Sequence, residues 1–249
     1  MRWLLSNVRN RARFAARHPG YAIRALLREL THADERFLSA ITGCSVGKLR
    51  AFLDEPFQDA TFARGLQAAI EASESSLDFG ADPYAKKVLV QYATVRASEP
   101  EIIVETGVAN GISSSYLMLA VQKNGRGRLH SIDIGGQDHL PAGKKVGWAV
   151  PDYLRQSWDL RIGDSRILLP RLLLELDTID VFIHDSLHVY EHMLWEYRTA
   201  YPHLRTGGLL FSDDALWNKA FAEFAVEVSA RQSAIVRGVG ILKKPSLRA

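Results

Sequence analysis

Residues 102–113 read IIVETGVANGIS, and this stretch decides the fold. Branched apolar residues lead into a turn that contains Gly107 and Gly111, and a helical pattern follows. A buried strand that turns through glycine into a helix is the opening unit of a βαβ fold. We expect Gly107 to let the backbone approach a ligand and Gly111 to let the helix pack close to the strand. The free N–H groups at the helix start favour a polar or negatively charged ligand group.

Short apolar runs alternate with helical patterns from this stretch onward. The predicted strands cover residues 102–104, 129–133, 160–163, 179–183 and 208–211, with helices at 113–122, 167–176 and 188–201 between them. Two closing strands are expected at 234–236 and 239–242. Alternating strands and helices imply parallel pairing. The sequence therefore predicts an α/β fold with a doubly wound, Rossmann-like, seven-stranded and mostly parallel sheet.

The first hundred residues have a different pattern. Apolar residues there recur at helical spacing, and we expect helices at 9–17, 21–30, 34–41, 48–53, 60–73 and 83–97. The last of these begins with Asp82 as N-cap and Pro83 in the first turn. We predict a helical extension over residues 1–80 and an α/β domain over residues 81–249.

The N-terminus is basic, with seven arginines before the first acidic residue, Glu29. Apolar residues such as Trp3 and Phe14 lie among them, and a basic amphipathic helix can bind an anionic membrane surface. Packing on a partner subunit and a solvated helix are the alternatives. Peripheral membrane contact and a homo-oligomer both stay open.

The amino-acid composition excludes several classes of protein for this chain. The chain has 249 residues, of which 47% are hydrophobic and 24% charged, as in ordinary globular proteins. Its net charge of +3 is too small to indicate nucleic acid, and we expect no nucleic-acid partner. The single cysteine, Cys44, excludes an intramolecular disulfide. No apolar run reaches the roughly 20 residues of a membrane span, and the start is too short in apolar residues for a signal peptide, so we expect a cytoplasmic location.

Acidic residues follow three successive strands. Glu105 ends the first, where a carboxylate suits a cationic group such as an amine, and Asp133 ends the second, where it is placed to accept hydrogen bonds from ribose hydroxyls. Asp164 follows the third, where an adenine amino group is expected. Three acids in this order indicate a nucleoside ligand at the carboxyl edge of the sheet.

The ETGVANGISS motif, residues 105–114, resembles the first motif of class I S-adenosylmethionine-dependent methyltransferases. Within that superfamily the chain is similar to the branch of macrocin-type sugar O-methyltransferases and cephalosporin hydroxylases, and more distantly to catechol O-methyltransferase-like enzymes. The resemblance covers residues 83–211. It implies that S-adenosylmethionine binds at the carboxyl edge, through Glu105, Gly107, Gly111, Ser113, Asp133, Asp164, Ser165 and Asp185.

A second group of polar residues follows the fourth and fifth strands. Asp185 lies after the fourth strand, and Asp213 and Asp214 lie after the fifth. Carboxylates on neighbouring strand ends repel one another unless a cation lies between them, and hard oxygen ligands suit Mg²⁺. We therefore predict a metal site of Asp185, Asp213 and Asp214. The alternative is that Asp213 and Asp214 only cap the next turn.

His188 is the candidate general base, because a neutral imidazole can accept a hydroxyl proton near pH 7. The resemblance supports it, since catechol-type enzymes hold a base three residues after the metal-binding aspartate. In those enzymes an Asp-Asn pair follows the fifth strand, whereas this chain has Asp213 and Asp214. His184 is the rival base, and a solvated histidine on a helix surface is the alternative for His188.

The predicted function is transfer of a methyl group to a hydroxyl of a sugar, glycolipid or other natural product, assisted by a divalent metal. The expected partner is a small-molecule or glycoside acceptor. A methyltransferase fold that binds but does not catalyse is one alternative. An NAD-dependent oxidoreductase is another, although Ala109 lies where the dinucleotide motif has its second glycine.

Overall fold

The computed structural model describes residues 32–71, 86–136, 140 and 142–245. The helices predicted at 9–17 and 21–30, the predicted boundary at residues 80 and 81, and the predicted helix start at Asp82 and Pro83 lie outside these ranges, so all of them stay predictions. Within the described ranges, no helix is both long enough and apolar enough to cross a membrane.

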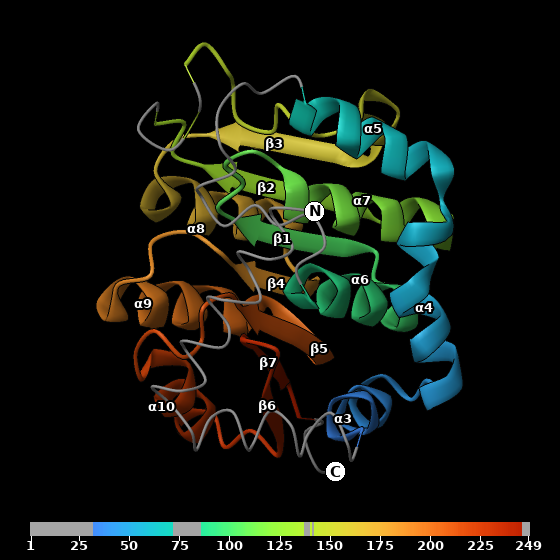
Figure 1. Ribbon diagram of the computed structural model, residues 1–249. Helices are drawn as coiled ribbons and strands as arrows, with labels where there is room; N and C mark the ends of the chain where they lie inside the picture. Colours follow the sequence, from blue (N-terminus) through green and yellow to red (C-terminus); the bar gives the residue numbers. More distant parts are fainter. Residues whose placement is uncertain (1–31, 72–85, 137–139, 141, 246–249) are drawn as a thin grey trace, which may run out of the picture.

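One seven-stranded sheet runs through the described residues (Figure 1). Its spatial order is β3-β2-β1-β4-β5-β7-β6. Neighbouring strands from β3 to β5 pair in parallel, whereas β7 is antiparallel to both β5 and β6. The strands are β1 (Ile102–Thr106), β2 (Arg128–Asp133), β3 (Trp158–Ile162), β4 (Ile179–His184), β5 (Leu204–Ser212), β6 (Gln232–Val236) and β7 (Val239–Lys243). This confirms the predicted fold class.

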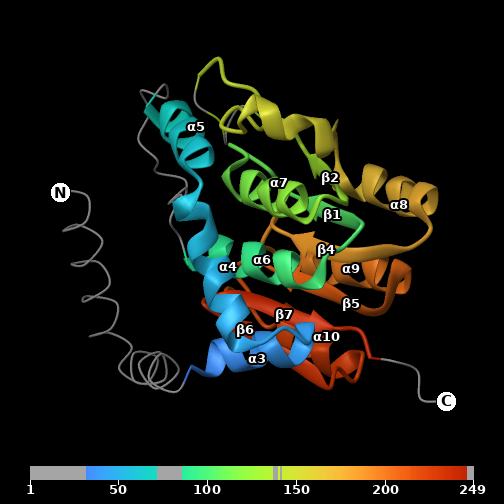
Figure 2. The ribbon, with the colours of Figure 1, turned by 90° about the vertical axis from the view of Figure 1, so that its right-hand side faces the viewer.

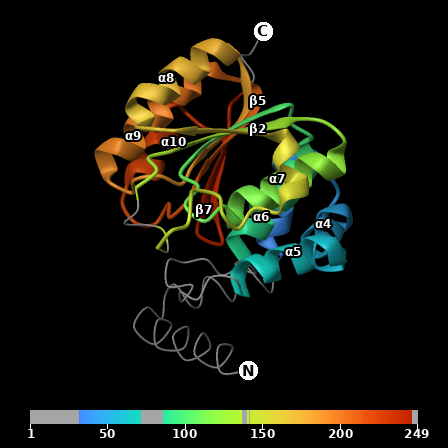
Figure 3. The same cartoon turned by 90° about the horizontal axis from the view of Figure 1, so that it is seen from above.

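Helices cover both faces of the sheet (Figure 3). One face carries α6 (Lys86–Ser98) and α7 (Ile112–Asn124), and the other carries α8 (Ser165–Leu176), α9 (Tyr190–Ala200) and α10 (Ala220–Glu227). Short 3-10 helices occur at Asp152–Ser157 and Tyr201–His203. Because β1 lies inside the sheet, both of its faces are buried: Ile103 belongs to the core beneath α6 and α7, and Val104 to the core beneath α8 and α9.

The predicted extension contributes three helices: α3 (Ala33–Thr42), α4 (Val46–Gln58) and α5 (Ala60–Glu71). Helices α4 and α5 lie outside the α6–α7 layer (Figure 2), whereas α3 contacts the end of the sheet, where Lys243 Nζ on β7 donates to the Ile41 carbonyl at 2.5 Å. Glu55 of α4 accepts hydrogen bonds from Tyr92 Oη at 2.6 Å and Arg96 Nε at 2.7 Å, both on α6. The rings of Phe62 on α5 and Tyr116 on α7 lie 4.9 Å apart, edge to face. These contacts fix α4 and α5 against the α/β domain.

Two local predictions differ from the structure. The helix predicted from residue 188 begins at Tyr190, so His188 lies in the loop after β4 and not on a helix surface. The sequence analysis also missed α10, an eight-residue helix. Its buried residues, Ala220, Phe221, Phe224 and Ala225, do follow helical spacing, so the pattern was present.

Candidate active site

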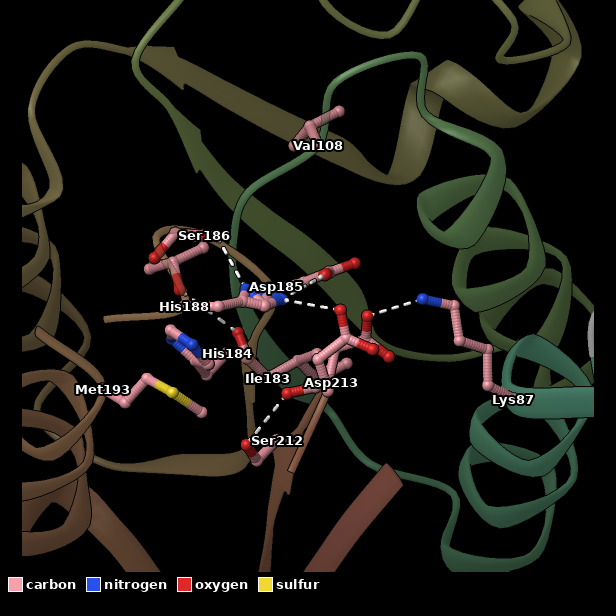
Figure 4. Close-up of polar contacts among 12 residues, drawn as sticks. Lys87, Val108, Ile183, His184, Asp185, Ser186, His188, Met193, Ser212 and Asp213 are labelled. Atoms are coloured by element: carbon pink, nitrogen blue, oxygen red, sulfur yellow. Dashed lines mark hydrogen bonds and ion pairs between the residues drawn. The ribbon is translucent and has the colours of Figure 1, made fainter. Parts of the chain in front are cut away.

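The candidate site lies at the carboxyl edge of the sheet, where the strand order reverses between β1 and β4. Ligands of open α/β sheets bind in the crevice outside such a reversal. The loops after β1, β2, β4 and β5 meet there, and Figure 4 shows the part formed after β4 and β5. The predicted residues are therefore brought to one edge by the topology.

Gly107 makes the β1 loop fit against β4. Its φ is +86°, and a Cβ added there would lie 2.0 Å from the carbonyl oxygen of Asp185. The Asp185 N–H donates to the Thr106 carbonyl at 2.8 Å, which extends the pairing of β1 with β4 to this point. A side chain at Gly107 would separate the two loops that carry the predicted site.

Gly111 has no room for a side chain because of the segment 147–150, and not because of the strand as expected. Its φ is also +86°, but a Cβ there would meet Val150 Cγ2 at 2.6 Å and Gly147 Cα at 2.9 Å. The close approach is thus to the segment 147–150 and not to the strand. Backbone hydrogen bonds attach this segment to the turn, from Gly147 to Ala109 at 2.8 Å and from Ala149 to Asn110 at 2.9 Å.

Glu105 is fully buried at the end of β1. Its Oε2 accepts from Ser114 Oγ at 2.7 Å and Ser131 Oγ at 2.8 Å, whereas Oε1 is buried without a hydrogen-bond partner among the described residues. Burial raises the pKa of Glu105 to about 7, against the opposing effect of the two hydroxyls. The carboxyl group therefore keeps one free acceptor oxygen beneath the glycine turn.

Asp133 holds the glycine turn in place. Its Oδ2 accepts from the backbone N–H groups of Val108 at 2.8 Å and Ala109 at 2.9 Å, and its Oδ1 accepts from Gly135 N at 2.8 Å. The side chain is half-buried at the end of β2. Asp133 thus has a structural task that the sequence analysis did not predict, and its contact with ribose stays a prediction.

The remaining predicted cofactor residues lie at the starts of two helices. Asp164 is exposed and caps α8, accepting from Arg166 N at 2.8 Å. Ser165 Oγ lies 3.4 Å from His192 Nε2 on α9. Ser113 is half-buried in the first turn of α7, and it is the next residue, Ser114, that bonds Glu105. The adenine contact of Asp164 and Ser165 stays a prediction.

Asp185, His188 and Asp213 form a cluster in which one ligand atom from each lies within 4.8 Å of the others. We call these three residues the acid–histidine cluster. Asp213 is almost fully buried, and its Oδ1 has no hydrogen-bond partner among the described residues. Burial and the charge of Asp213 raise the pKa of Asp185, as expected for carboxylates that repel each other. Asp214, the third predicted metal ligand, is half-exposed beside His188.

His188 has one nitrogen free to accept a proton. Its Nδ1 lies 3.1 Å from the Ser186 carbonyl oxygen, which only a donor N–H can satisfy, so Nε2 is left as the acceptor in the neutral ring. Nε2 lies 3.7 Å from Asp185 Oδ1 and 3.6 Å from Asp214 Oδ2. Burial and the neighbouring His184 lower the pKa of His188, which keeps the ring neutral near pH 7.

Lys87 is a member of the site that the sequence analysis missed. It reaches from α6 to Asp213, and its Nζ lies 2.5 Å from Asp213 Oδ2 (Figure 4). Burial alone would lower the pKa of Lys87, but Asp185 and Asp213 outweigh it and raise the pKa. The two partners are 126 residues apart in sequence, so no local pattern could have indicated the pair.

A buried network beneath the acid–histidine cluster was also missed. Glu196 on α9 accepts from Thr106 Oγ1 at 2.6 Å and Ser186 Oγ at 2.9 Å, and it bonds His184 Nδ1 at 2.6 Å and His192 Nε2 at 2.9 Å. His184, the rival base, is fully buried, and its Nε2 has no partner among the described residues. The spacing of His192 and Glu196, one helical turn apart, was the available signal.

Comparison with known proteins gives a domain family for the central part of the chain. Residues 104–215 match the family model of a methyltransferase domain. Comparison with curated protein sequences gives no match.

Two solved structures share the fold. A methyltransferase from Podospora anserina, PaMTH1, crystallised with S-adenosylhomocysteine, has 13% identity and a TM-score of 0.53 over 73% of this chain and 88% of its own. CalS11, a TDP-rhamnose 3'-O-methyltransferase of calicheamicin biosynthesis, has 17% identity and a TM-score of 0.52 over 74% of this chain and 95% of its own.

The matched region begins within β1, contains the glycine turn, Asp133 and the acid–histidine cluster, and ends shortly after β5. The sheet order with its antiparallel β7 is that of the predicted fold class. Residues 104–215 thus match a methyltransferase domain, and the chain shares the fold of the two solved methyltransferases.

Proposed function

We propose that this chain transfers the methyl group of S-adenosylmethionine to a hydroxyl oxygen of a sugar, glycolipid or other natural product. The observation that carries the proposal is His188, whose Nε2 is an acceptor beside three carboxylates. Gly107 brings the β1 turn against this loop, so a cofactor at the turn would lie next to the imidazole.

In the proposed reaction, the acceptor oxygen bonds to the methyl carbon while the carbon–sulfur bond breaks. The hydroxyl proton passes to Nε2 of His188. His188 is preferred over His184 as the base, because His184 is fully buried and bonded to Glu196. The glycine turn and the segment 147–150 would hold the two reactants in line, which is the main contribution available to an enzyme in a direct displacement.

The cofactor is expected to use residues already described. Glu105 offers the free Oε1, Gly107 and Gly111 leave backbone space, and Ser113 lies in the first turn of α7. Asp133, Asp164, Ser165 and Asp185 complete the predicted set along the sheet edge.

The carboxylates of the acid–histidine cluster suit a divalent cation, and His188 Nε2 is left to accept the proton. Asp185 and Asp213 have ligand atoms within 4.8 Å of each other, and Asp213 Oδ1 is a buried oxygen without a hydrogen-bond partner among the described residues. Asp214 beside His188 could supply a further oxygen. A bound Mg²⁺ would lower the pKa of the acceptor hydroxyl and orient it.

The first test is calorimetry of the full chain with S-adenosylhomocysteine and with NAD. We expect binding of the first only, and binding of NAD alone would contradict the proposal.

The second test is transfer of labelled methyl groups to a panel of hydroxylated glycosides. His188→Ala should slow transfer at least about a hundredfold, as loss of a general base does, with unchanged S-adenosylhomocysteine affinity. His203→Ala, which alters a histidine after α9, is the matched control.

A further inference from the structure

Lys87 lies at the candidate site but has no role in the proposed methyl transfer. It belongs to α6, the helix before β1, and Figure 4 shows it reaching the acid–histidine cluster from the side opposite His188. Its side chain is 32% exposed, whereas the Asp213 side chain that it contacts is 3% exposed. The ion pair is therefore shielded from water mainly on the carboxylate side, where charges interact more strongly than in bulk solvent.

The charges around Lys87 are unbalanced. Asp185, Asp213 and Asp214 all face it from the loops after β4 and β5. Within the described residues, Lys87 at Asp213 is the one lysine or arginine that forms an ion pair with any of these carboxylates, whereas Asp185 and Asp214 lie near His188. Its ammonium therefore compensates part of the repulsion that a divalent cation would otherwise relieve.

A divalent cation and Lys87 would need the same carboxylate. Lys87 holds Asp213 Oδ2 at 2.5 Å, and a cation bound by Asp185 and Asp213 would bond the same side chain. Two cations on one buried carboxylate repel each other strongly, because little water separates them. The cation must bind weakly beside the ammonium or displace it.

We propose that Lys87 is a resident counter-ion that competes with divalent cations for Asp213 and so limits the metal affinity of the site. The inference rests on the metal-binding part of the proposed function and not on methyl transfer. With Lys87 in place, the site keeps a positive charge near the acceptor position at low metal concentration. At high metal concentration the divalent cation replaces this charge.

The experiment measures Mn²⁺ binding by electron paramagnetic resonance on the full chain, without cofactor or acceptor. Lys87→Met keeps the aliphatic stem and removes the charge, and we expect Mn²⁺ to bind at least about tenfold more tightly than to the wild type. Lys123→Met is the matched control, because Lys123 forms a similar pair with Asp59 at 2.7 Å and has a similar exposure of 34%. It should bind Mn²⁺ like the wild type.

Unchanged or weaker Mn²⁺ binding by Lys87→Met would overturn the proposal. The double variant Lys87→Met with Asp213→Asn should lose the gained affinity, and retention of that affinity would also overturn it. Lys87→Arg keeps the charge and should bind as weakly as the wild type, so tight binding there would contradict the proposal even if Lys87→Met did not fold. Calorimetry with S-adenosylhomocysteine on the same proteins tests the cofactor separately, so the two proposals can fail independently.

Discussion

Two buried glutamates beneath the same sheet edge have pKa values that are shifted in opposite directions. Glu105 ends β1, Glu196 lies on α9, and both side chains are fully buried. Glu105 accepts hydrogen bonds from two serine hydroxyls on one oxygen only. Glu196 interacts through both oxygens with two histidines, a threonine and a serine.

The difference shows that the charge of a buried carboxyl group depends on its partners as well as on its burial. Burial raises the pKa of both groups. At Glu105 it prevails, and the pKa is about 7, whereas His184 and His192 outweigh it at Glu196 and hold the pKa well below its usual range. Glu196 is thus a permanent charge that organises α9 and β4, while Glu105 is a group near neutrality with an oxygen free for a ligand.

The largest expected effect comes from Glu196→Gln. The substitution removes the buried charge that pairs with His184 and His192, and loss of one partner in a buried ionic group costs about 3–5 kcal/mol in the free energy of unfolding. Urea unfolding at pH 8 measures it. A loss below about 1 kcal/mol would show that the histidines do not depend on this carboxylate.

Glu105→Gln should stabilise the protein at pH 8, whereas Glu196→Gln should destabilise it. A folded pKa of about 7, above the ordinary 4.5, means that the folded state binds more protons between these values, so this contribution to stability is present below pH 4.5 and is lost as pH rises through 7. The wild type should therefore lose up to about 3 kcal/mol relative to Glu105→Gln over this range. Urea unfolding of both proteins at several pH values measures the difference, and parallel pH profiles would show that the pKa of Glu105 is unshifted.

The smallest effect is expected for Ser114→Ala, which removes one of the two donors to Glu105. Loss of this hydrogen bond should cost about 1 kcal/mol at pH 8 and move the pH-dependent step of Glu105 to higher pH. Ser115→Ala is the matched control, because the Ser115 hydroxyl is also buried on α7 but bonds the Gly111 carbonyl at 2.7 Å. A shift of the step in both variants would show that Ser114 has no specific effect on Glu105.

Local patterns were sufficient for the strands of the sheet and for the position of the predicted site residues at the strand ends. All seven predicted strands exist, because buried parallel strands are short apolar runs between turns. The structure also brings Glu105, Asp133, Asp185 and Asp213 to one edge, because the carboxyl ends of parallel strands meet there. The place of His188 was less certain from sequence, since helix ends vary by a residue or two, and it lies in a loop.

Contacts between distant segments were beyond the reach of sequence patterns. Lys87 pairs with Asp213 across 126 residues, and Asp133 bonds the amides of Val108 and Ala109 in the preceding loop. Gly111 could be recognised as a turn glycine, but the segment 147–150 that requires it could not.

The sequence by itself determined the alternation of strands and helices, the glycine turn and the acids at the strand ends, because period and glycine placement are local properties. Only the tertiary structure decided which carboxylates are charged and which are held by a cation. Those properties depend on the burial of each group and on donors from other elements, such as His184 and His192 at Glu196 and the two serines at Glu105. The chemistry of this edge is therefore set by packing that no single segment encodes.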